Sequence, residues 1–461
     1  MKQWIRGVVG VVAMVSLGAN EGSWQDIFER GTLQGGVRSH YFLSDKGENH
    51  SVYGLGGHLL WQSYPWYHLS MRVGLYGDVN PWHMSDEDAV LYKSGKDVLN
   101  RYDVLTYGKY GLLNVAQASL SYVDDKIDVR FGRQIFESFL TKANDAKMVP
   151  NTFEGVSVSW ETAPKRTFKM AYLWRQKLRD HNSFHHLLAY GESSSSDPYG
   201  KYLQNDDSYM HKGLTLSALK AAGIEDRLWV FDGVYKRKEG FSWAMNLSFV
   251  PELLAYGMAE VGYAWVLPTF RLYTSGRYFY QDDRGAGRIG GANLQTNTVG
   301  YKDPTSLDAS LYALKCELSF GAHFWHLGYS SVANKGDFVT PWRGLPTSGY
   351  TRAMSQGNWY ANTKSTMLSY AYDFSKSHLV EGLKIKMGYV WQDFDDTKAG
   401  VQADSNVFTI DIVKKIASIQ GLLVKLRLID VKGDSQTIAQ DGTRKDDPSY
   451  DALRFEIKYT F

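Results

Sequence analysis

The chain lacks the features that several common protein classes require. Cysteine occurs once in 461 residues, at Cys316, which excludes a disulfide-stabilised scaffold and a four-cysteine zinc module. The 51 basic and 49 acidic side chains nearly cancel, so the net charge of +2 gives no indication of a nucleic-acid-binding protein. The mean hydropathy of −0.35 is too polar for a bundle of membrane-spanning helices. Small secreted domains, zinc modules and helical membrane proteins are therefore excluded.

Aromatic residues and glycine are abundant instead. The chain holds 31 Tyr, 21 Phe and 14 Trp, and it has 44 Gly against only 11 Pro. Aromatic side chains favour strands, and glycine is common in the turns between them. The composition therefore indicates a protein with many strands and turns.

The first nineteen residues have the pattern of an export signal. Residues 1–6 are basic, and residues 7–19 form an apolar run that ends in small residues. This run is too short to anchor the chain across a bilayer, and a buried N-terminal helix is the alternative. We expect cleavage near Ala19, which leaves residues 20–33 as a short periplasmic segment before the folded domain.

The end of the chain alternates strictly between apolar and polar side chains. From Leu453 to Phe461 every odd position is apolar, whereas the even positions are polar or charged. In water, this period of two predicts a half-buried strand of a sandwich. In a membrane, it predicts a strand with one face toward lipid and the other toward a wet lumen. The same alternation recurs at 168–175, 241–249, 383–391 and 422–428.

The connections between these strands favour the membrane interpretation. We count about eighteen strands between residues 34 and 461, joined alternately by short turns and by mostly long loops. The long loops are 78–109, 135–152, 177–226, 281–308, 333–362 and 432–450. Short periplasmic turns and long extracellular loops are typical of outer-membrane barrels. The predicted fold class is all-β: one transmembrane antiparallel β-barrel at 34–461, wide enough to leave an aqueous channel.

Residues 126–160 carry the most specific motifs. A strand ends in Phe131-Gly132-Arg133-Gln134, and Asn144-Asp145 and Met148-Val149-Pro150 follow in the loop. Thr152-Phe153-Glu154-Gly155 then opens the next strand, and Gly336-Asp337 and the 421–427 strand fit the same pattern. On these motifs the chain resembles the OprD-type (Opr family) outer-membrane porins of Gram-negative bacteria, although the long loop at 178–226 departs from the family pattern.

The resemblance implies an eighteen-stranded channel for small hydrophilic solutes, often carboxylates. It also implies that the third loop, here 135–152, folds inward as the constriction. This loop carries Lys142, Asn144, Asp145 and Lys147 as predicted polar contacts. The partners implied are outer-membrane lipid and small solutes, with a homotrimer expected from porin-like families and no nucleic acid.

A basic lumen follows from the alternation itself. A Lys or Arg on the lipid face near mid-bilayer costs ~2–4 kcal/mol, so the charged faces must point inward. The inferred lumenal acids are fewer, chiefly Asp128, Glu317 and Glu456. The basic set is Arg72, Arg130, Lys169, Arg175, Arg271, Arg277, Lys315, Lys384, Lys386, Lys425, Arg427, Arg454 and Lys458.

Two interpretations of this basic set stay open. Aligned basic side chains raise the local anion concentration in a narrow pore and would make it prefer anions. Alternatively, the charges only solvate the wall and pair with one another. Acids in the loops oppose an anion preference if their side chains extend into the narrow part of the pore. These acids are Asp86, Asp88, Asp206, Asp207, Asp282 and Asp283.

No catalytic residue, metal site or cofactor is predicted. Residues 285–290 match G-x-G-x-x-G, but the segment that follows has the pattern of a loop and not of the helix that a dinucleotide site needs. His181, His185 and His186 lie in a long loop without paired carboxylates or cysteines, so we interpret them as surface histidines. G-x-S-x-G and HExxH motifs are absent. A loop-plugged structural or adhesive barrel stays an alternative, and an outer-membrane enzyme a weaker one.

Overall fold

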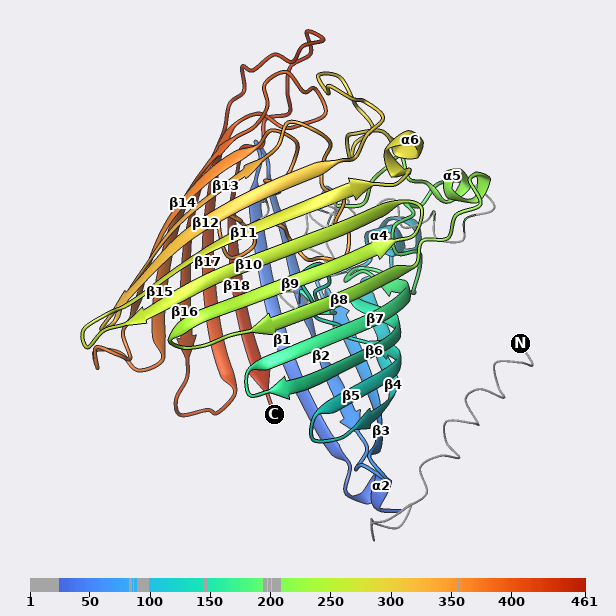
Figure 1. Cartoon of the computed structure of the whole chain (residues 1–461). Helices are drawn as coiled ribbons and strands as arrows, with labels where there is room; N and C mark the ends of the chain where they lie inside the picture. The colour runs from blue at the N-terminus through green and yellow to red at the C-terminus, as the bar shows by residue number, and fades with distance from the viewer. Residues whose placement is uncertain are drawn as a thin grey trace.

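The chain forms one closed antiparallel sheet of eighteen strands, seen as a tilted barrel in Figure 1. The computed structural model describes residues 25–461 apart from 83–84, 86, 89–98, 145–147, 194–196, 198–199, 201–208 and 355. Every strand pairs with its neighbours in sequence, and β1 pairs with both β2 and β18. This last pairing closes the barrel, so the sheet has no free edge.

The strands agree in number and order with those predicted. They are β1 (Thr32–Asp45), β2 (Asn49–Gln62), β3 (Leu69–Val79), β4 (Gly111–Val123), β5 (Ile127–Gln134), β6 (Thr152–Ala163), β7 (Arg166–Lys177), β8 (Leu228–Tyr235), β9 (Gly240–Val250), β10 (Leu254–Val266), β11 (Arg271–Asp283), β12 (Ala309–Phe320), β13 (His323–Val332), β14 (Lys364–Asp373), β15 (Leu383–Asp393), β16 (Ser405–Lys415), β17 (Leu422–Gly433) and β18 (Tyr450–Thr460). The described helices are short: α2 (Asp26–Glu29), α4 (Arg101–Tyr107), α5 (Leu216–Ala221) and α6 (Ala286–Gly290). None of the helices in the described part of the chain is long and apolar enough to cross a membrane.

The terminal residues complete the closure. The Phe461 N–H donates to the Gly35 carbonyl oxygen, and the Gly35 N–H donates to the Phe461 oxygen; each N···O distance is 3.0 Å. The outward side chains of β18, such as Phe455, Ile457 and Tyr459, are exposed, as expected for side chains that contact lipid in a membrane. At the opposite face Arg454 and Glu456 are sheltered in the lumen. The alternation at the C-terminus is therefore the alternation between lipid and lumen.

A bulge in β7 overturns one predicted lumenal residue. Glu154 pairs with Arg175, but the next residue, Gly155, pairs with Leu173, so Trp174 is an extra residue in β7. Beyond a bulge the alternation shifts by one position. Arg175 therefore lies exposed on the outer face, opposite the Glu154 that pairs with Arg133 at 2.9 Å, and not in the lumen as predicted.

The largest buried apolar cluster lies inside the barrel and not between layers. It joins lumenal wall residues such as Phe279 and Leu311 to loop residues such as Leu140, Leu187 and Trp342. The described parts of three long connections, residues 135–151, 178–227 and 333–363, therefore fold inward and pack against the wall and one another. Burial of their apolar side chains, at about 25 cal/mol per Å², holds these loops inside.

Candidate functional site: the inward loops and the lumenal wall

The tip of loop 135–151 rests on the wall formed by β7, β8 and β11. The Lys169 ammonium donates to the Glu137 carbonyl oxygen at 2.8 Å, and the Asp232 carboxylate accepts from the Phe139 N–H. The Phe139 ring packs edge-on against Phe279, with centroids 4.9 Å apart, and the Arg277 guanidinium lies 5.0 Å from the Phe139 centroid. The loop therefore folds inward but stays against one side of the lumen.

The predicted polar contacts of this loop are only partly described. Lys142 pairs with Glu137 at 3.2 Å, and both side chains are accessible from the lumen. Asn144 adopts a φ of 48° and lines the same cavity as Lys142. Asp145 and Lys147 lie outside the described residues. The cavity measures about 960 Å³ and includes Asp232 in its lining.

Loop 333–363 reaches about as deep as loop 135–151, whose Glu137 carbonyl oxygen contacts Lys169, the fourth residue of β7 from its short-turn end. The Tyr350 hydroxyl lies 2.9 Å from the Ser275 hydroxyl, and the Tyr350 carbonyl oxygen lies 2.8 Å from His326 Nε2. A Cβ on Gly328 would lie 2.2 Å from that carbonyl oxygen, so only glycine allows the approach. Because His326 is the fourth residue of β13, counted from the short-turn end, the loop passes the middle of the wall.

The two loops are joined to each other. The Gly344 N–H donates to the Leu140 carbonyl oxygen at 2.8 Å, and the Lys142 N–H donates to the Trp342 oxygen at 3.0 Å. Thr141 and Arg343 form a β-bridge between these two contacts. Two inserted loops are therefore joined inside the lumen, and sequence reasoning singled out one of them.

Arg277 anchors these loops to the wall. Its guanidinium donates to Glu260 at 2.6 Å and to the carbonyl oxygens of Pro346 and Ser348 at 2.8 and 3.0 Å. The Tyr350 ring lies between Arg277 and Lys315, whose charged groups are 4.6 and 5.3 Å from its centroid. Each donor direction of Arg277 is thus engaged, so this predicted lumenal residue acts mainly as a structural tie.

Several other predicted lumenal residues also have close partners. Their contacts are Arg130 with Asp128 at 2.5 Å, Lys315 with Glu317 at 3.0 Å, Arg72 with Gln62 at 2.6 Å, Arg271 with the Lys238 carbonyl oxygen at 3.2 Å, and Arg427 with Asp411. The acids Asp232, Glu260 and Asp411 were missed by sequence reasoning. The cost of a charge in lipid would have placed them in the lumen, because each lies within a strand that sequence reasoning had identified.

The remaining basic residues gather on one side of the barrel. Along β15, β16, β17 and β18 the register places Lys386 opposite Asp411, Asp411 opposite Arg427, and Arg427 opposite Arg454. Lys458 lies opposite Arg38 in the closing pair of strands. We call this surface the basic wall; it consists of Arg38, Lys384, Lys386, Lys425, Arg427, Arg454 and Lys458, with Asp373, Asp411 and Glu456 as the acids among them.

The basic wall is only partly neutralised. Arg38 pairs with Glu456 at 2.9 Å, and Arg427 pairs with Asp411. Within the described part of the chain, the ammonium groups of Lys384, Lys386, Lys425 and Lys458 make no ion pair. These lysines share the wall with the Arg427 guanidinium, which lies 2.9 Å from the Met354 sulfur of the inserted loop. The unpaired charge therefore lies on the same wall that loop 333–363 contacts through Met354.

The histidines of loop 178–227 are not surface residues as predicted. His181 and His185 are buried, and their Nδ1 and Nε2 atoms lie 2.7 Å apart. Burial lowers the pKa of His185 to about 4, so its ring is neutral at pH 7. His186 is partly exposed, 3.6 Å from Asp226. The pair is a packing feature of the inward loop.

The glycine-rich segment 285–290 is an extracellular turn that includes α6. Its Gly285 and Gly287 N–H groups donate to Asp283, whose carboxylate occupies the position that an anionic ligand would need.

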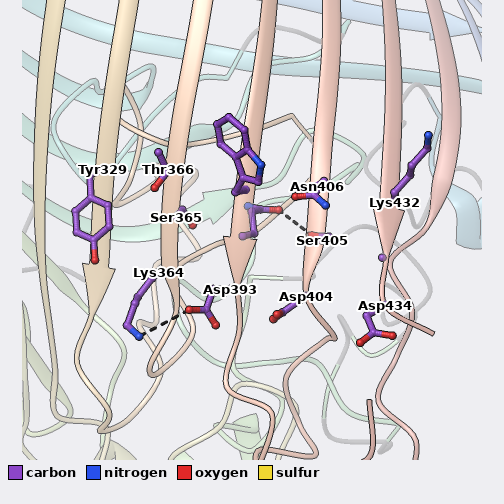
Figure 2. Close-up of a pocket in the computed structure, with 13 residues that line it drawn as sticks. Tyr329, Lys364, Ser365, Thr366, Asp393, Asp404, Ser405, Asn406, Lys432 and Asp434 are labelled. Carbon is purple, nitrogen blue, oxygen red and sulfur yellow. Dashed lines mark hydrogen bonds and ion pairs between the residues drawn. The ribbon is translucent and has the colours of Figure 1, made fainter. Parts of the chain in front are cut away.

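A second hollow, of about 540 Å³, lies at the extracellular ends of β13–β17 (Figure 2). There Lys364 and Asp393 lie 3.7 Å apart, beside the exposed Trp391. Because Trp391 belongs to the outward face of β15, this hollow opens away from the lumen.

A closed barrel with an apolar outer face and a charged lumen defines an outer-membrane channel. The family model of the outer membrane porin, OprD family, matches residues 106–461, and the chain belongs to this family. It is an outer-membrane porin for small solutes, surrounded by the lipid of that membrane.

Solved structures share the fold at low sequence identity. OccK8 (OprE) of Pseudomonas aeruginosa superposes with a TM-score of 0.72 at 14% identity, over 94% of this chain and 99% of that one. OpdK of the same organism, solved with vanillate, gives 0.70 at 15% over 94% and 99%. OccAB2 of Acinetobacter baumannii gives 0.70 at 15% over 96% and 99%. No curated protein sequence matches the chain.

Proposed function

We propose that this porin prefers anions and that small carboxylates are among its solutes. The observation that carries the proposal is the basic wall, where seven basic side chains face three carboxylates. On the loop side of the lumen Arg130, Arg277 and Lys315 are each paired with an acid. The bonded partners of Arg72, Lys169 and Arg271 are neutral, so these side chains add to the positive charge. The basic wall holds the largest group of basic side chains, so the sign of the selectivity should depend mainly on it.

The expected preference is moderate and depends on salt. In a wet pore two unit charges at contact interact by about 1 kcal/mol, a factor of about five in local concentration. Salt at 0.1 M screens charges over about 10 Å, and at 1 M over about 3 Å. Four unpaired lysines acting together at low salt attract carboxylates, while the same lysines at high salt have little effect. The vanillate in the similar OpdK structure is itself a carboxylate, which supports the same solute class.

The reversal potential of the purified protein in a planar bilayer tests this proposal. Under a potassium chloride gradient at low salt, we expect a potential of the sign that chloride selectivity gives, and we expect it to shrink at 1 M. Cation selectivity at low salt would contradict the anion preference and leave the porin assignment intact. A bilayer that stays silent would favour the alternative of a loop-plugged barrel, which the packing of three loops inside the lumen keeps open.

The homotrimer expected from porin-like families stays a prediction. Chemical cross-linking of the purified protein in detergent tests it, since a trimer gives a ladder that ends at three chains.

A further inference from the structure

Asp337 is a buried carboxylate surrounded by hydrogen-bond donors. Its side chain has no exposed surface and accepts from the Tyr301 hydroxyl at 2.7 Å and the Ala361 N–H at 2.9 Å through one oxygen. The other oxygen accepts from Asn293 Nδ2 at 2.9 Å and the Leu294 N–H at 3.1 Å. Four donors directed at one carboxylate form a built site, yet nothing in the channel lumen touches it.

These donors come from two different loops. Asn293, Leu294 and Tyr301 belong to the connection between β11 and β12, whereas Ala361 lies at the far end of loop 333–363. Asp337 itself lies at the near end of loop 333–363. Its carboxylate therefore joins the two stems of this loop to each other and ties both to the neighbouring loop.

The backbone around Asp337 repeats the same connections. The Asp337 N–H donates to the Ala292 carbonyl oxygen at 2.9 Å, and the Gly336 N–H donates to the Asp308 oxygen at 2.8 Å. A Cβ on Gly336 would lie 2.6 Å from the Ser306 carbonyl oxygen, so glycine is required for the approach. This explains in physical terms the Gly336-Asp337 pair that the sequence displays.

A third loop adds to this arrangement. The buried Lys398 ammonium, from the connection between β15 and β16, donates to Asp395 at 2.6 Å and to Asn334 Oδ1 at 2.7 Å. It also lies 5.0 Å from the centroid of the Tyr301 ring. We call Asn293, Tyr301, Asp337, Ala361 and Lys398 the loop clamp.

We propose that Asp337 is the positioning residue of the channel constriction. The inference rests on the proposed function, because it assumes an open channel whose lumen contains loop 333–363. The loop clamp holds the two stems of loop 333–363 at the extracellular side. The part of the loop between the stems contains Arg343 and Tyr350 and extends into the lumen. Removing the carboxylate leaves the Tyr301 hydroxyl and the Leu294 and Ala361 N–H groups buried without this acceptor, whereas Asn293 Nδ2 keeps the Gly400 carbonyl oxygen at 3.2 Å. Three buried donors without an acceptor favour separation of the stems and entry of water. The inserted part then leaves its place against the wall.

The test compares Asp337→Ala and Tyr301→Phe with Asp303→Ala as the matched control. Asp303 is an exposed carboxylate of the same extracellular loop that bonds only to Thr305, so its removal should change nothing in the lumen. We expect Asp337→Ala to raise single-channel conductance severalfold or to add frequent steps to larger open levels. Tyr301→Phe removes one of the four donors and should give a smaller change in the same direction.

Limited trypsin digestion provides an independent measure of loop position. The Arg343 side chain is 3% exposed in the intact loop, so cleavage after it reports release. We expect rapid cleavage there in Asp337→Ala, slower cleavage in Tyr301→Phe, and protection in the wild type and in Asp303→Ala. A role limited to barrel stability would instead lower the temperature of the electrophoretic heat shift and leave unit conductance unchanged.

The outcomes separate this inference from the proposed function. Wild-type conductance and a protected Arg343 in a heat-shifting Asp337→Ala protein would overturn the role of Asp337. If Asp337→Ala does not fold, the same result in Tyr301→Phe overturns it. A wild type that conducts cations contradicts only the anion preference, whereas a silent wild type contradicts the channel and leaves the trypsin assay to decide on the loop clamp.

Discussion

Replacement of residues 343–354 by a short glycine–serine linker is expected to raise single-channel conductance severalfold. This segment contains Tyr350, the part of loop 333–363 that reaches past the middle of β13. Its removal opens the lumen on the side of β10–β13, where Arg277 would lose the Pro346 and Ser348 acceptors but keep Glu260. The barrel itself should persist, because its closure depends on strand pairing and not on the loop.

A second excision measures the share of loop 135–151. Removing residues 138–144 takes away Phe139, which packs against Arg277 and donates to Asp232, but leaves the Glu137 contact with Lys169. We expect a smaller rise in conductance, because this excision is the shorter of the two. A control shortens the exposed turn at Asp441 and Gly442 between β17 and β18 and should leave conductance unchanged. If the excision of 138–144 has the larger effect, the constriction belongs mainly to loop 135–151, as the sequence resemblance implied.

The strands could be predicted from the sequence because a membrane imposes their period. Lipid on one face and water on the other require alternation along every strand, and residues 453–461 show it without exception. The same reasoning places Lys386, Lys425 and Arg454 in the lumen, where the register of β15, β17 and β18 has them. The alternation of short and long connections predicted closure of the sheet.

The same reasoning failed where the period is interrupted or absent. Trp174 is an extra residue in β7, and no local signal distinguishes it from a regular strand position, so Arg175 was assigned to the wrong face. His181 and His185 lie in a loop without periodicity, and their burial depends on packing against distant segments. The position of Tyr350 depends on Gly328 of β13, which has no side chain to block the Tyr350 carbonyl oxygen. The two residues are in contact but are distant in the sequence, so no local pattern reveals it.

Charge reversal at two positions of the basic wall is expected to remove most of the anion preference. The double substitution Lys386→Glu and Lys425→Glu turns seven basic side chains against three acids into five against five. The new carboxylates lie opposite Asp411 and Glu456, respectively, so acids gather where the two unpaired ammonium groups had been. Because both positions face a wet lumen, the substitution does not carry the cost of a charge placed in lipid.

The matched control makes the same change of charge outside the pore. Lys364 and Lys432 lie at the outward rim shown in Figure 2, so Lys364→Glu with Lys432→Glu alters net charge equally without touching the lumen. In a salt gradient at low ionic strength we expect the lumenal variant to lose most of its anion selectivity and the rim variant to keep the wild-type reversal potential. At 1 M salt the two variants should converge, because charges separated by more than about 3 Å are then screened. Equal shifts in both variants would mean that the surface potential at the channel mouth, and not the basic wall, sets the selectivity. An unchanged lumenal variant would mean instead that ions pass along the loop side, where Arg277 and Glu260 neutralise each other.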